Sequence, residues 1–401
     1  MRARLRQYLA MCGISLGGAL RAKWMTATVI TSVAIVVVVL MGFQAMAAGF
    51  RQTLRNTGSD SIAVLMSQEA SSETSSQVSR EQVELLRNAP AVVRDANGTA
   101  VSPEVAVIAT GRRRADGSRV NLTIRGLGPA GVALRPGFRL VSGRMFEVGR
   151  NEIIAGRGIS SEVKGLDLGA QIRLGNVEWK VVGIFALDAH LFESEIWAAA
   201  ASVQSGFGRA NQFQSVRARL ASPDSLADLT LFTASDPRLD LNVQTEKSYY
   251  AKQSEGSVNV MQYLGWPLAL VLSIGAIAGT FNAMLISIQS RKREIAIVRQ
   301  LGFERGALFA SILVESIALS AVGALLGTVL AYLLFNGVLT STLGTGFTTI
   351  TYALRVDRTA ALQALLLALS IGVFGGLVPA WRGIAATTVS KSKARTYAHE
   401  E

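Results

Sequence analysis

The chain has 401 residues, of which half are hydrophobic and only 17% are charged, and its formal net charge is +12. A soluble domain usually carries about 25% charged residues, so this composition argues against a wholly soluble protein. Because Cys12 is the only cysteine, no intramolecular disulfide can form, and every domain must be stabilised by its own core.

Four stretches are apolar enough to cross a bilayer, near residues 25–48, 264–288, 311–338 and 360–381. A helix needs about 20 apolar residues to cross roughly 30 Å of hydrocarbon. With their flanks, these stretches predict transmembrane helices over 24–50, 259–290, 306–338 and 359–381. The predicted fold is an α-helical membrane protein with four transmembrane helices and an α+β extracytoplasmic domain inserted between helices 1 and 2.

The N-terminal segment, residues 1–23, is basic and precedes the first predicted span. A basic start, an apolar run and "AMA" at 45–47 resemble a secretory signal with its cleavage site. The apolar run exceeds the roughly 7 to 15 residues of a signal core, which favours an uncleaved anchor.

The inserted domain, residues 51–258, has two predicted strand-helix-strand units, near 59–110 and 215–250, around a β-rich insertion near 111–214. The expected strands are 59–66, 104–110, 215–220 and 241–250, and the expected helices are 79–90 and 222–235. Within the insertion, 171–185 predicts a hairpin that turns at Gly175 and Asn176.

Two patterns in this domain suggest chemistry, and both have a simpler interpretation. Gly126, Gly128 and Gly131 fit a dinucleotide-binding spacing, but Pro129 lies inside it and no helix is expected to follow, so we interpret it as a turn. Asp188, His190, Glu193 and Glu195 are spaced for a metal or acid-base site, although an exposed polar loop is favoured. We therefore expect no catalytic, cofactor-binding or metal-binding residues.

The segment 291–305 is charged and lies between two predicted spans. Ile295, Val298 and Leu301 recur at helical spacing, and basic residues occupy the other positions. Such an amphipathic helix at the inner membrane surface is suited to docking into a groove on a cytosolic protein. The alternative is an inert helix held by anionic lipid.

The third and fourth spans contain one acid and two pairs of glycines. Glu315 is either an interfacial residue or is buried against a neighbouring helix or an arginine of the cytosolic segment. Each glycine pair has the spacing that allows close helix packing, within one bundle or across a dimer. The pairs are Gly323 with Gly327 and Gly372 with Gly376.

The basic residues predict the orientation. Three segments together hold +10 of the formal net charge of +12: residues 1–23, 291–305 and the tail 382–401. With four spans, all three lie on one side of the membrane. The positive-inside rule makes that side the cytoplasm, with both termini, and makes 339–358 a short periplasmic loop. The basic excess is therefore a topology signal, and we expect contact with the lipid bilayer and no nucleic-acid partner.

The chain resembles the FtsX/MacB-like permeases of ABC transporters over essentially its whole length, and the specific motifs lie in the last third. The resemblance rests on the start at 291–295, then Arg299, Leu301 with Gly302, Arg305, Glu315, Gly323 and Gly327, and a closing Pro379-Ala380-x-Arg382. The tail "TTVSKSKAR" departs from the family pattern. The resemblance implies that a coupling helix seated in an ATPase comprises Arg291, Arg293, Glu294, Ile295, Val298, Arg299, Leu301, Gly302 and Arg305.

The resemblance also implies the partners and the mechanism. Two identical or different permeases would pair, each with a cytosolic ABC ATPase that binds ATP and Mg, because this chain has no G-x-x-x-x-G-K-[ST] motif. ATPase closure would move the periplasmic domains without threading substrate through the membrane. The favoured function is export or extraction of a hydrophobic compound, peptide or lipoprotein with a periplasmic adaptor. Control of a cell-wall hydrolase and a receptor unrelated to ABC transporters are the alternatives.

Overall fold

A computed structural model describes residues 7–8, 11–13, 15, 17, 23–95, 98–187, 191–222, 224–343 and 349–396, with side chains left undescribed at 95, 98–99, 343 and 383–396. The chain divides into two compact units. The helical unit comprises Met1–Ala48, Val260–Val338 and Arg355–Glu401, and the sheet unit comprises Gly49–Asn259 and Leu339–Leu354.

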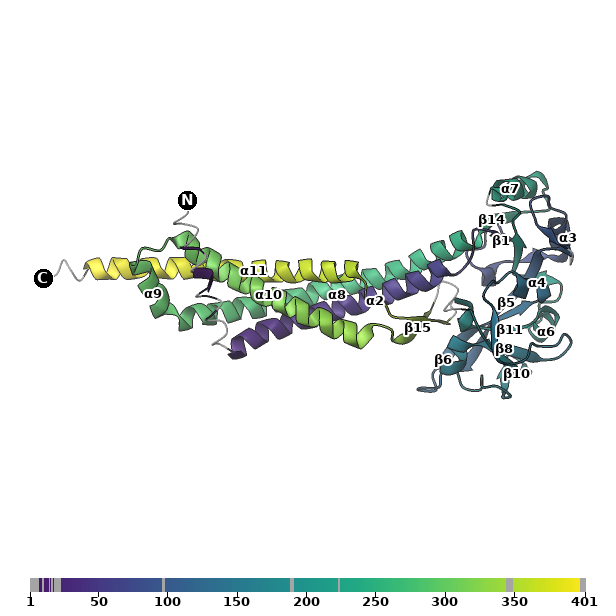
Figure 1. Cartoon of the computed structure of the whole chain (residues 1–401), viewed down its shortest axis with the longest axis horizontal. Coiled ribbons are helices and arrows are strands. Elements are labelled where there is room, and N and C mark those ends of the chain that lie inside the picture. Colours follow the sequence, from purple (N-terminus) through teal and green to yellow (C-terminus); the bar gives the residue numbers. More distant parts are fainter. Residues whose placement is uncertain are drawn as a thin grey trace. The chain divides into compact units, whose positions relative to one another are not determined.

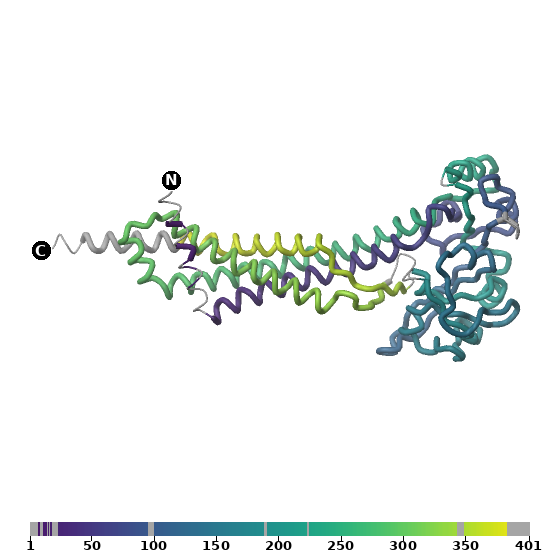
Figure 2. The backbone as a smooth tube through the Cα atoms, in the orientation of Figure 1, coloured from purple at the N-terminus to yellow at the C-terminus, as the bar shows by residue number. Residues whose placement is uncertain are grey.

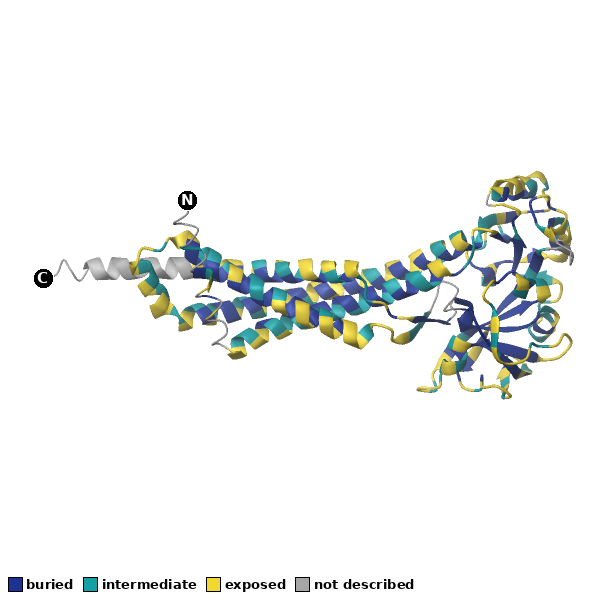
Figure 3. Ribbon diagram, in the orientation of Figure 1, coloured by how far each residue is buried: buried dark blue, intermediate teal, exposed yellow. Residues whose placement is uncertain are grey.

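Four long helices run alongside one another in the helical unit (Figures 1 and 2). They belong to α2 (Lys23–Asn56), α8 (Glu246–Ser290), α10 (Arg305–Phe335) and α11 (Arg358–Thr396), and the short α9 (Lys292–Gln300) follows α8. Each of the four is long and apolar enough to cross a membrane, in agreement with the four predicted spans. Large apolar residues such as Leu333, Ile274 and Leu366 are exposed, as expected where lipid replaces water. Figure 3 shows exposed residues along the long helices.

The sheet unit is built on a large mixed sheet. Among the described residues, ten strands form the sheet. Nine pair in the order β14-β1-β13-β5-β6-β11-β8-β10-β7, and β9 also pairs with β10. The strands are β1 (Ile62–Ser67), β5 (Val101–Arg112), β6 (Arg119–Leu127), β7 (Arg139–Gly143), β8 (Glu152–Gly156), β9 (Gln171–Leu174), β10 (Val177–Ala186), β11 (Glu195–Ala199), β13 (Ser215–Arg219) and β14 (Leu241–Thr245).

Short helices and strand pairs complete the sheet unit. The helices are η1 (Glu73–Ser75), α3 (Arg80–Arg87), α4 (Pro129–Ala133), α5 (Arg157–Glu162), η2 (Leu191–Ser194), α6 (Ala200–Gly206) and α7 (Ser225–Ser235). The strand pairs are β2 (Val78–Ser79) with β12 (Gln212–Phe213), β3 (Arg94–Asp95) with β4 (Gly98–Thr99), and β15 (Leu339–Leu343) with β16 (Thr349–Ala353).

Both predicted strand-helix-strand units are present, but their strands interleave. β1 and β5, joined through α3, are separated in the sheet by β13, and β1 also pairs with β14. This is a split β-α-β arrangement, in which each unit completes the other. Its core packs Val83 and Leu86 of α3 and Leu229 of α7 against the strands.

One long strand joins this part of the sheet to the β-rich insertion. The first residues of β5 pair with β13, and Val105 to its last residue pair with β6. Val101 therefore belongs to the first core and Val105 to a second core, which contains Trp179 and Ile196. The predicted hairpin is confirmed, because Leu174 pairs with Val177 across a two-residue turn.

Two sequence interpretations are wrong in detail, and the structure adds detail to a third. The strand expected over 241–250 ends at Thr245, because Glu246 begins α8. The turn expected at Gly128 is the start of α4, where Pro129 occupies a first-turn position that requires no N–H donor. The predicted loop 339–358 contains the hairpin of β15 and β16, which belongs to the sheet unit.

Candidate functional site

The predicted coupling segment forms α9 and the turn into α10. Its helix ends in a Schellman motif, because Gly302 N–H donates to the Arg299 carbonyl at 3.1 Å and Phe303 N–H donates to the Val298 carbonyl at 3.5 Å. Gly302 has φ +89°, a left-handed conformation that favours glycine. Its position in the segment is thus explained by helix termination.

The two faces of α9 differ from the expectation. Ile295 and Val298, expected to form the docking stripe, pack with Phe303 against the helical unit's own side chains. Ile297 is 58% exposed and Leu301 is 74% exposed, one turn apart. The apolar pair available to a partner is therefore Ile297 and Leu301, and the exposed Arg293 lies one turn before it.

The remaining predicted docking residues lie around this face. Glu294 and Arg305 are exposed, and Arg305 is the first residue of α10. Arg299 is partly buried and interacts with another group. Arg291 immediately precedes α9 and points into the bundle, where its Nη1 lies 3.4 Å from Glu315 Oε2. The structure therefore separates Arg291 from the outward face.

Glu315 is buried on α10, which agrees with the second of its two interpretations. Its side chain is 3% exposed, and Oε2 accepts hydrogen bonds from the Ser15 hydroxyl and from Arg291. Arg291 Nη1 also donates to the Ser15 carbonyl at 3.1 Å. This cluster links the start of α9 to α10 and to the N-terminal segment.

The glycine pairs lie where helices of the same bundle meet. A Cβ added to Gly323 would lie 2.9 Å from the Ile30 carbonyl oxygen of α2, and one added to Gly327 would lie 2.8 Å from the Ala34 carbonyl oxygen. Gly372 and Gly376 of α11 face α10 in the same way. The small-residue spacing is therefore used for packing within the chain.

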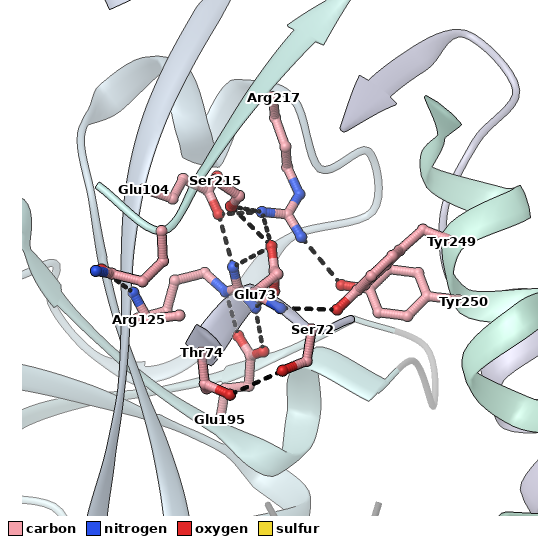
Figure 4. Close-up of polar contacts among 12 residues, drawn as sticks. Ser72, Glu73, Thr74, Glu104, Arg125, Glu195, Ser215, Arg217, Tyr249 and Tyr250 are labelled. Atoms are coloured by element: carbon pink, nitrogen blue, oxygen red, sulfur yellow. Dashed lines mark hydrogen bonds and ion pairs between the residues drawn. The ribbon is translucent and has the colours of Figure 1, made fainter. Parts of the chain in front are cut away.

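The sheet unit contains a buried charged network that the sequence did not predict (Figure 4). Its members come from strands far apart in sequence and from η1, α8 and the turn after α4. Four carboxylates and three guanidinium groups take part: Glu73, Glu104, Glu195, Glu246, Arg125, Arg135 and Arg217.

Two arginines connect most of the network. Arg125 of β6 lies 2.8 Å from Glu73 of η1, 2.9 Å from Glu104 of β5 and 2.6 Å from Glu195 of β11. Arg217 of β13 lies 2.6 Å from Glu104, and it also donates to Glu246 at 2.9 Å and to the Tyr250 hydroxyl at 3.0 Å. The first turn of α8 is thereby tied to the centre of the sheet.

The network favours the charged forms of its members. Burial by itself would raise the pKa of Glu104, but Arg135, Arg217 and Arg125 lower it to about 2. Burial likewise opposes ionisation of Glu73, yet Arg125 and Arg217 hold its pKa well below the usual range. The desolvation cost is offset because the carboxylates and guanidinium groups pair at hydrogen-bond distance.

We expect the sheet unit to lose stability in acid. Because the folded-state pKa of Glu104 lies below its unfolded value near 4.5, its contribution is complete above about pH 5 and is lost as pH falls towards 2. Glu104 alone accounts for on the order of 3 kcal/mol. Urea unfolding of the whole chain, followed by near-ultraviolet circular dichroism from pH 7 to pH 3, measures this loss.

Salt provides the control for the acid experiment. Exposed ion pairs are screened in about 0.5 M NaCl, whereas buried pairs are screened much less, so the pH dependence should persist. A stability that stays constant down to pH 3, or a dependence abolished by salt, would contradict the role given to the buried carboxylates.

Strand alternation explains why the network was missed. Arg217 lies between Val216 and Ala218, which enter the apolar core, so the pattern is that of a strand with one solvent-facing side. In the structure that polar side is covered, and Arg217 is completely buried. The sequence feature that could have indicated the network is the recurrence of arginine and glutamate between apolar residues on several strands.

The prediction of an exposed polar loop near residue 190 is wrong for the two glutamates that the structure describes. Glu193 and Glu195 are buried, not in an exposed loop, and Glu195 belongs to β11 and pairs with Arg125. Asp188 and His190 lie outside the described residues. Among the residues that the structure describes, no group of three or more histidine, cysteine or acidic side chains is placed to hold a metal.

Family models match both parts of the chain. A model of the FtsX-like permease C-terminal region matches residues 267–387, and a model of the MacB-like periplasmic core domain matches residues 25–230. Together with four apolar helices, these matches define a membrane permease of the ABC transporter class. The chain belongs to the family of FtsX-like permeases that carry a MacB-like periplasmic core domain.

Two of three similar curated relatives have export-related names. The chain is 24% identical to the macrolide export ATP-binding/permease protein MacB of Bordetella avium, over 94% of this chain and 56% of that protein. It is 29% identical to the uncharacterized ABC transporter permease YknZ of Bacillus subtilis, over 48% of this chain and 52% of that protein. It is 26% identical to the pyoverdine export ATP-binding/permease protein PvdT of Pseudomonas entomophila, over 53% of this chain and 33% of that protein. The chain thus spans about half of these relatives' length or less.

Two solved structures are similar to part of the chain. The extracellular domain of YknZ matches with 15% identity and a TM-score of 0.35, over 46% of this chain and all of that one. The periplasmic region of MacB from Actinobacillus actinomycetemcomitans matches with 11% identity and a TM-score of 0.36, over 47% of this chain and 90% of that one.

Proposed function

We propose that this chain is the permease subunit of an ABC exporter and that the outward face of α9 is the docking site for its ATPase. The observation that carries the proposal is the exposure of Ile297 and Leu301 on a short, basic helix between two apolar helices. Large apolar side chains at the centre of a contact, surrounded by charged ones, are typical of a protein interface.

The partner in this proposal is a separate cytosolic ATPase, which binds ATP and Mg. The segment 291–305, both termini and the tail then lie in the cytoplasm of a bacterium, and the sheet unit lies outside its inner membrane. The asymmetric distribution of basic residues in the sequence supports this orientation. A second permease subunit and a periplasmic adaptor complete the proposed assembly.

Motion of the ATPase would be passed on mechanically. α8 is one continuous helix of 45 residues that contributes to both units, and α9 follows its last residue directly. Its first turn is anchored in the sheet unit by Glu246 and Tyr250, which both bind Arg217. A movement applied at α9 would therefore reach the sheet unit along a hydrogen-bonded helix.

We propose export or extraction of a hydrophobic compound, peptide or lipoprotein as the transported class. The export-related names of MacB and PvdT support export over control of a cell-wall hydrolase. Affinity purification from the native membrane in mild detergent, followed by mass spectrometry, distinguishes these functions. An ATPase with an adaptor supports export, an ATPase with a hydrolase supports regulation, and the chain alone supports a receptor.

The docking face has its own test. Leu301→Asp should reduce co-purification of the ATPase at least about tenfold, because the contact would bury a carboxylate without a partner. We choose Leu301 over Gly302, since a side chain at φ +89° would strain the backbone and confound the result. The amount of membrane-inserted chain and the amount of co-purified ATPase are measured in the same sample.

Val148→Asp is the matched control. Val148 is 76% exposed, similar to Leu301, but it lies in the sheet unit. This variant should retain the ATPase. Equal recovery of ATPase with both variants would exclude the outward face of α9 as the docking site.

A further inference from the structure

A basic tip closes the hairpin formed by β5 and β6 in the sheet unit. Residues 112–119 contain four arginines, and their only acid, Asp116, bonds within the turn to Ser118. Arg112 and Arg119 are exposed and lie directly opposite each other on the two strands. Like charges in this position destabilise a sheet, so this arginine pair gains from binding an anion.

The other two arginines of the tip have partners within the sheet unit. Arg114 pairs with Asp167 at 3.0 Å, and Arg113 donates to the Ser341 hydroxyl at 3.0 Å. Neither an ion pair nor a side-chain hydrogen bond joins the arginine pair to any residue that the structure describes. Two neighbouring guanidinium groups are therefore available, and the guanidinium fork matches the geometry of phosphate oxygens.

The length of the chain limits the distance between this tip and a membrane surface. Arg113 bonds to Ser341 of β15, which follows Phe335, the last residue of the candidate span α10, by six residues. Because an extended chain covers at most about 3.6 Å per residue, Ser341 lies within roughly 20 Å of the end of that span. Leu339, on the same face of β15 as Ser341, is 65% exposed. An exposed leucine near basic residues is typical of a surface that meets lipid headgroups.

We infer that the arginine pair and Leu339 form a contact surface for an anionic bilayer. The two guanidinium groups bind phosphate oxygens of phospholipid headgroups, and Leu339 enters the boundary between the headgroups and the acyl chains. Such a contact would restrain the sheet unit at an anionic membrane and release it at a neutral one. The inference rests on the membrane location of the helical unit but not on the docking of an ATPase.

A fluorophore attached to the tip reports this contact. Cys12→Ser removes the only cysteine of the chain, and Ala115→Cys introduces a single one at an exposed position in the turn. The labelled full chain is reconstituted into nanodiscs of phosphatidylcholine, either pure or mixed with phosphatidylglycerol. Every nanodisc also contains a trace of lipid with a spin-labelled headgroup, which quenches the fluorophore only when the tip lies at the bilayer surface.

Quenching should be stronger in the nanodiscs that contain phosphatidylglycerol. We expect the ratio of bilayer-bound to free tips to be at least about tenfold higher there than in pure phosphatidylcholine, because an anionic surface attracts both arginines. The choline lipid has the same phosphate, but its headgroup carries no net charge. Equal quenching in the two kinds of nanodisc would overturn the inference.

Two double variants assign the contact to the arginine pair. Arg112→Gln with Arg119→Gln should lower quenching in the anionic nanodiscs to the level of the neutral ones. Arg80→Gln with Arg87→Gln removes the same charge from exposed positions of α3, which packs on the other core of the sheet unit, and should leave quenching unchanged. An equal loss in both double variants would show a general attraction of cationic residues and would overturn the inference.

Salt and an acidic protein partner provide two further tests. About 0.5 M NaCl should weaken the contact, because exposed charges are screened, and quenching that is unaffected by salt would contradict the role of the arginines. If the arginine pair instead binds an acidic protein, the nanodiscs show no dependence on lipid charge. Arg112→Gln with Arg119→Gln then loses a protein that co-purifies from the native membrane, and that result would overturn the assignment to lipid.

ATPase co-purification is measured on the same variants. Arg112→Gln with Arg119→Gln should retain the ATPase and lose the lipid contact, whereas Leu301→Asp should lose the ATPase and keep the lipid contact. Failure of the lipid inference is thereby separated from failure of the proposed docking site.

Discussion

Replacing Arg217 with alanine is expected to lower the free energy of unfolding of the sheet unit by about 3 to 5 kcal/mol. The substitution removes a completely buried guanidinium and leaves Glu104 and Glu246 with fewer partners at the centre of the sheet. An unpaired buried carboxylate costs much more than the loss of one surface ion pair. Hydrogen-deuterium exchange of the full chain, read on peptides from β5 and β13, measures the change.

Arg238→Ala is the control for this experiment. Arg238 pairs with Asp236 at 2.7 Å, but its side chain is 60% exposed, so its loss should cost no more than about 1 kcal/mol. Similar exchange rates in the two variants would show that the buried network contributes little to stability. Faster exchange at the first turn of α8 in Arg217→Ala would also support the proposed anchoring through Glu246.

Gly327→Leu is expected to prevent correct packing of the helical unit. Even a methyl group at this position would lie 2.8 Å from the Ala34 carbonyl oxygen and 2.9 Å from the Val37 Cβ. Because the first of these is backbone, α2 and α10 would have to separate, and overpacking by a single group already costs about 1 to 3 kcal/mol. We expect a sharply reduced yield of folded chain, measured by fluorescence-detected size-exclusion chromatography in detergent.

Gly275→Leu serves as the comparison. Gly275 also lies inside a predicted span, on α8, but a Cβ there would meet no atom within 4 Å. Leucine has the higher helix propensity, so this variant should fold as well as the original chain. A normal yield for Gly327→Leu would show that the contact with α2 is not required.

The sequence by itself determined the number of long helices, the position of the inserted domain and the strand-helix-strand units. These features follow from local patterns, because an uncharged run of about 20 residues or a strict alternation has few other solutions. The hairpin at Gly175 was predictable for the same reason, since two turn residues between short apolar strands specify their own pairing. Glu315 was recognised as unusual, and an arginine of the cytosolic segment was one of its predicted partners. Ser15 was not predicted as a partner.

The tertiary structure decided what the local patterns left ambiguous. Helical spacing placed Ile295, Val298 and Leu301 on one predicted stripe of α9. Only packing beside Phe303 assigned Val298 to the interior and left Leu301 outside with Ile297. Alternation on β13 gave Arg217 the appearance of a surface residue, and only the covering of that face by η1 and α8 buried it among carboxylates. Burial depends on which distant segments come to lie over a residue, and the pattern of a single strand or helix contains no information about them.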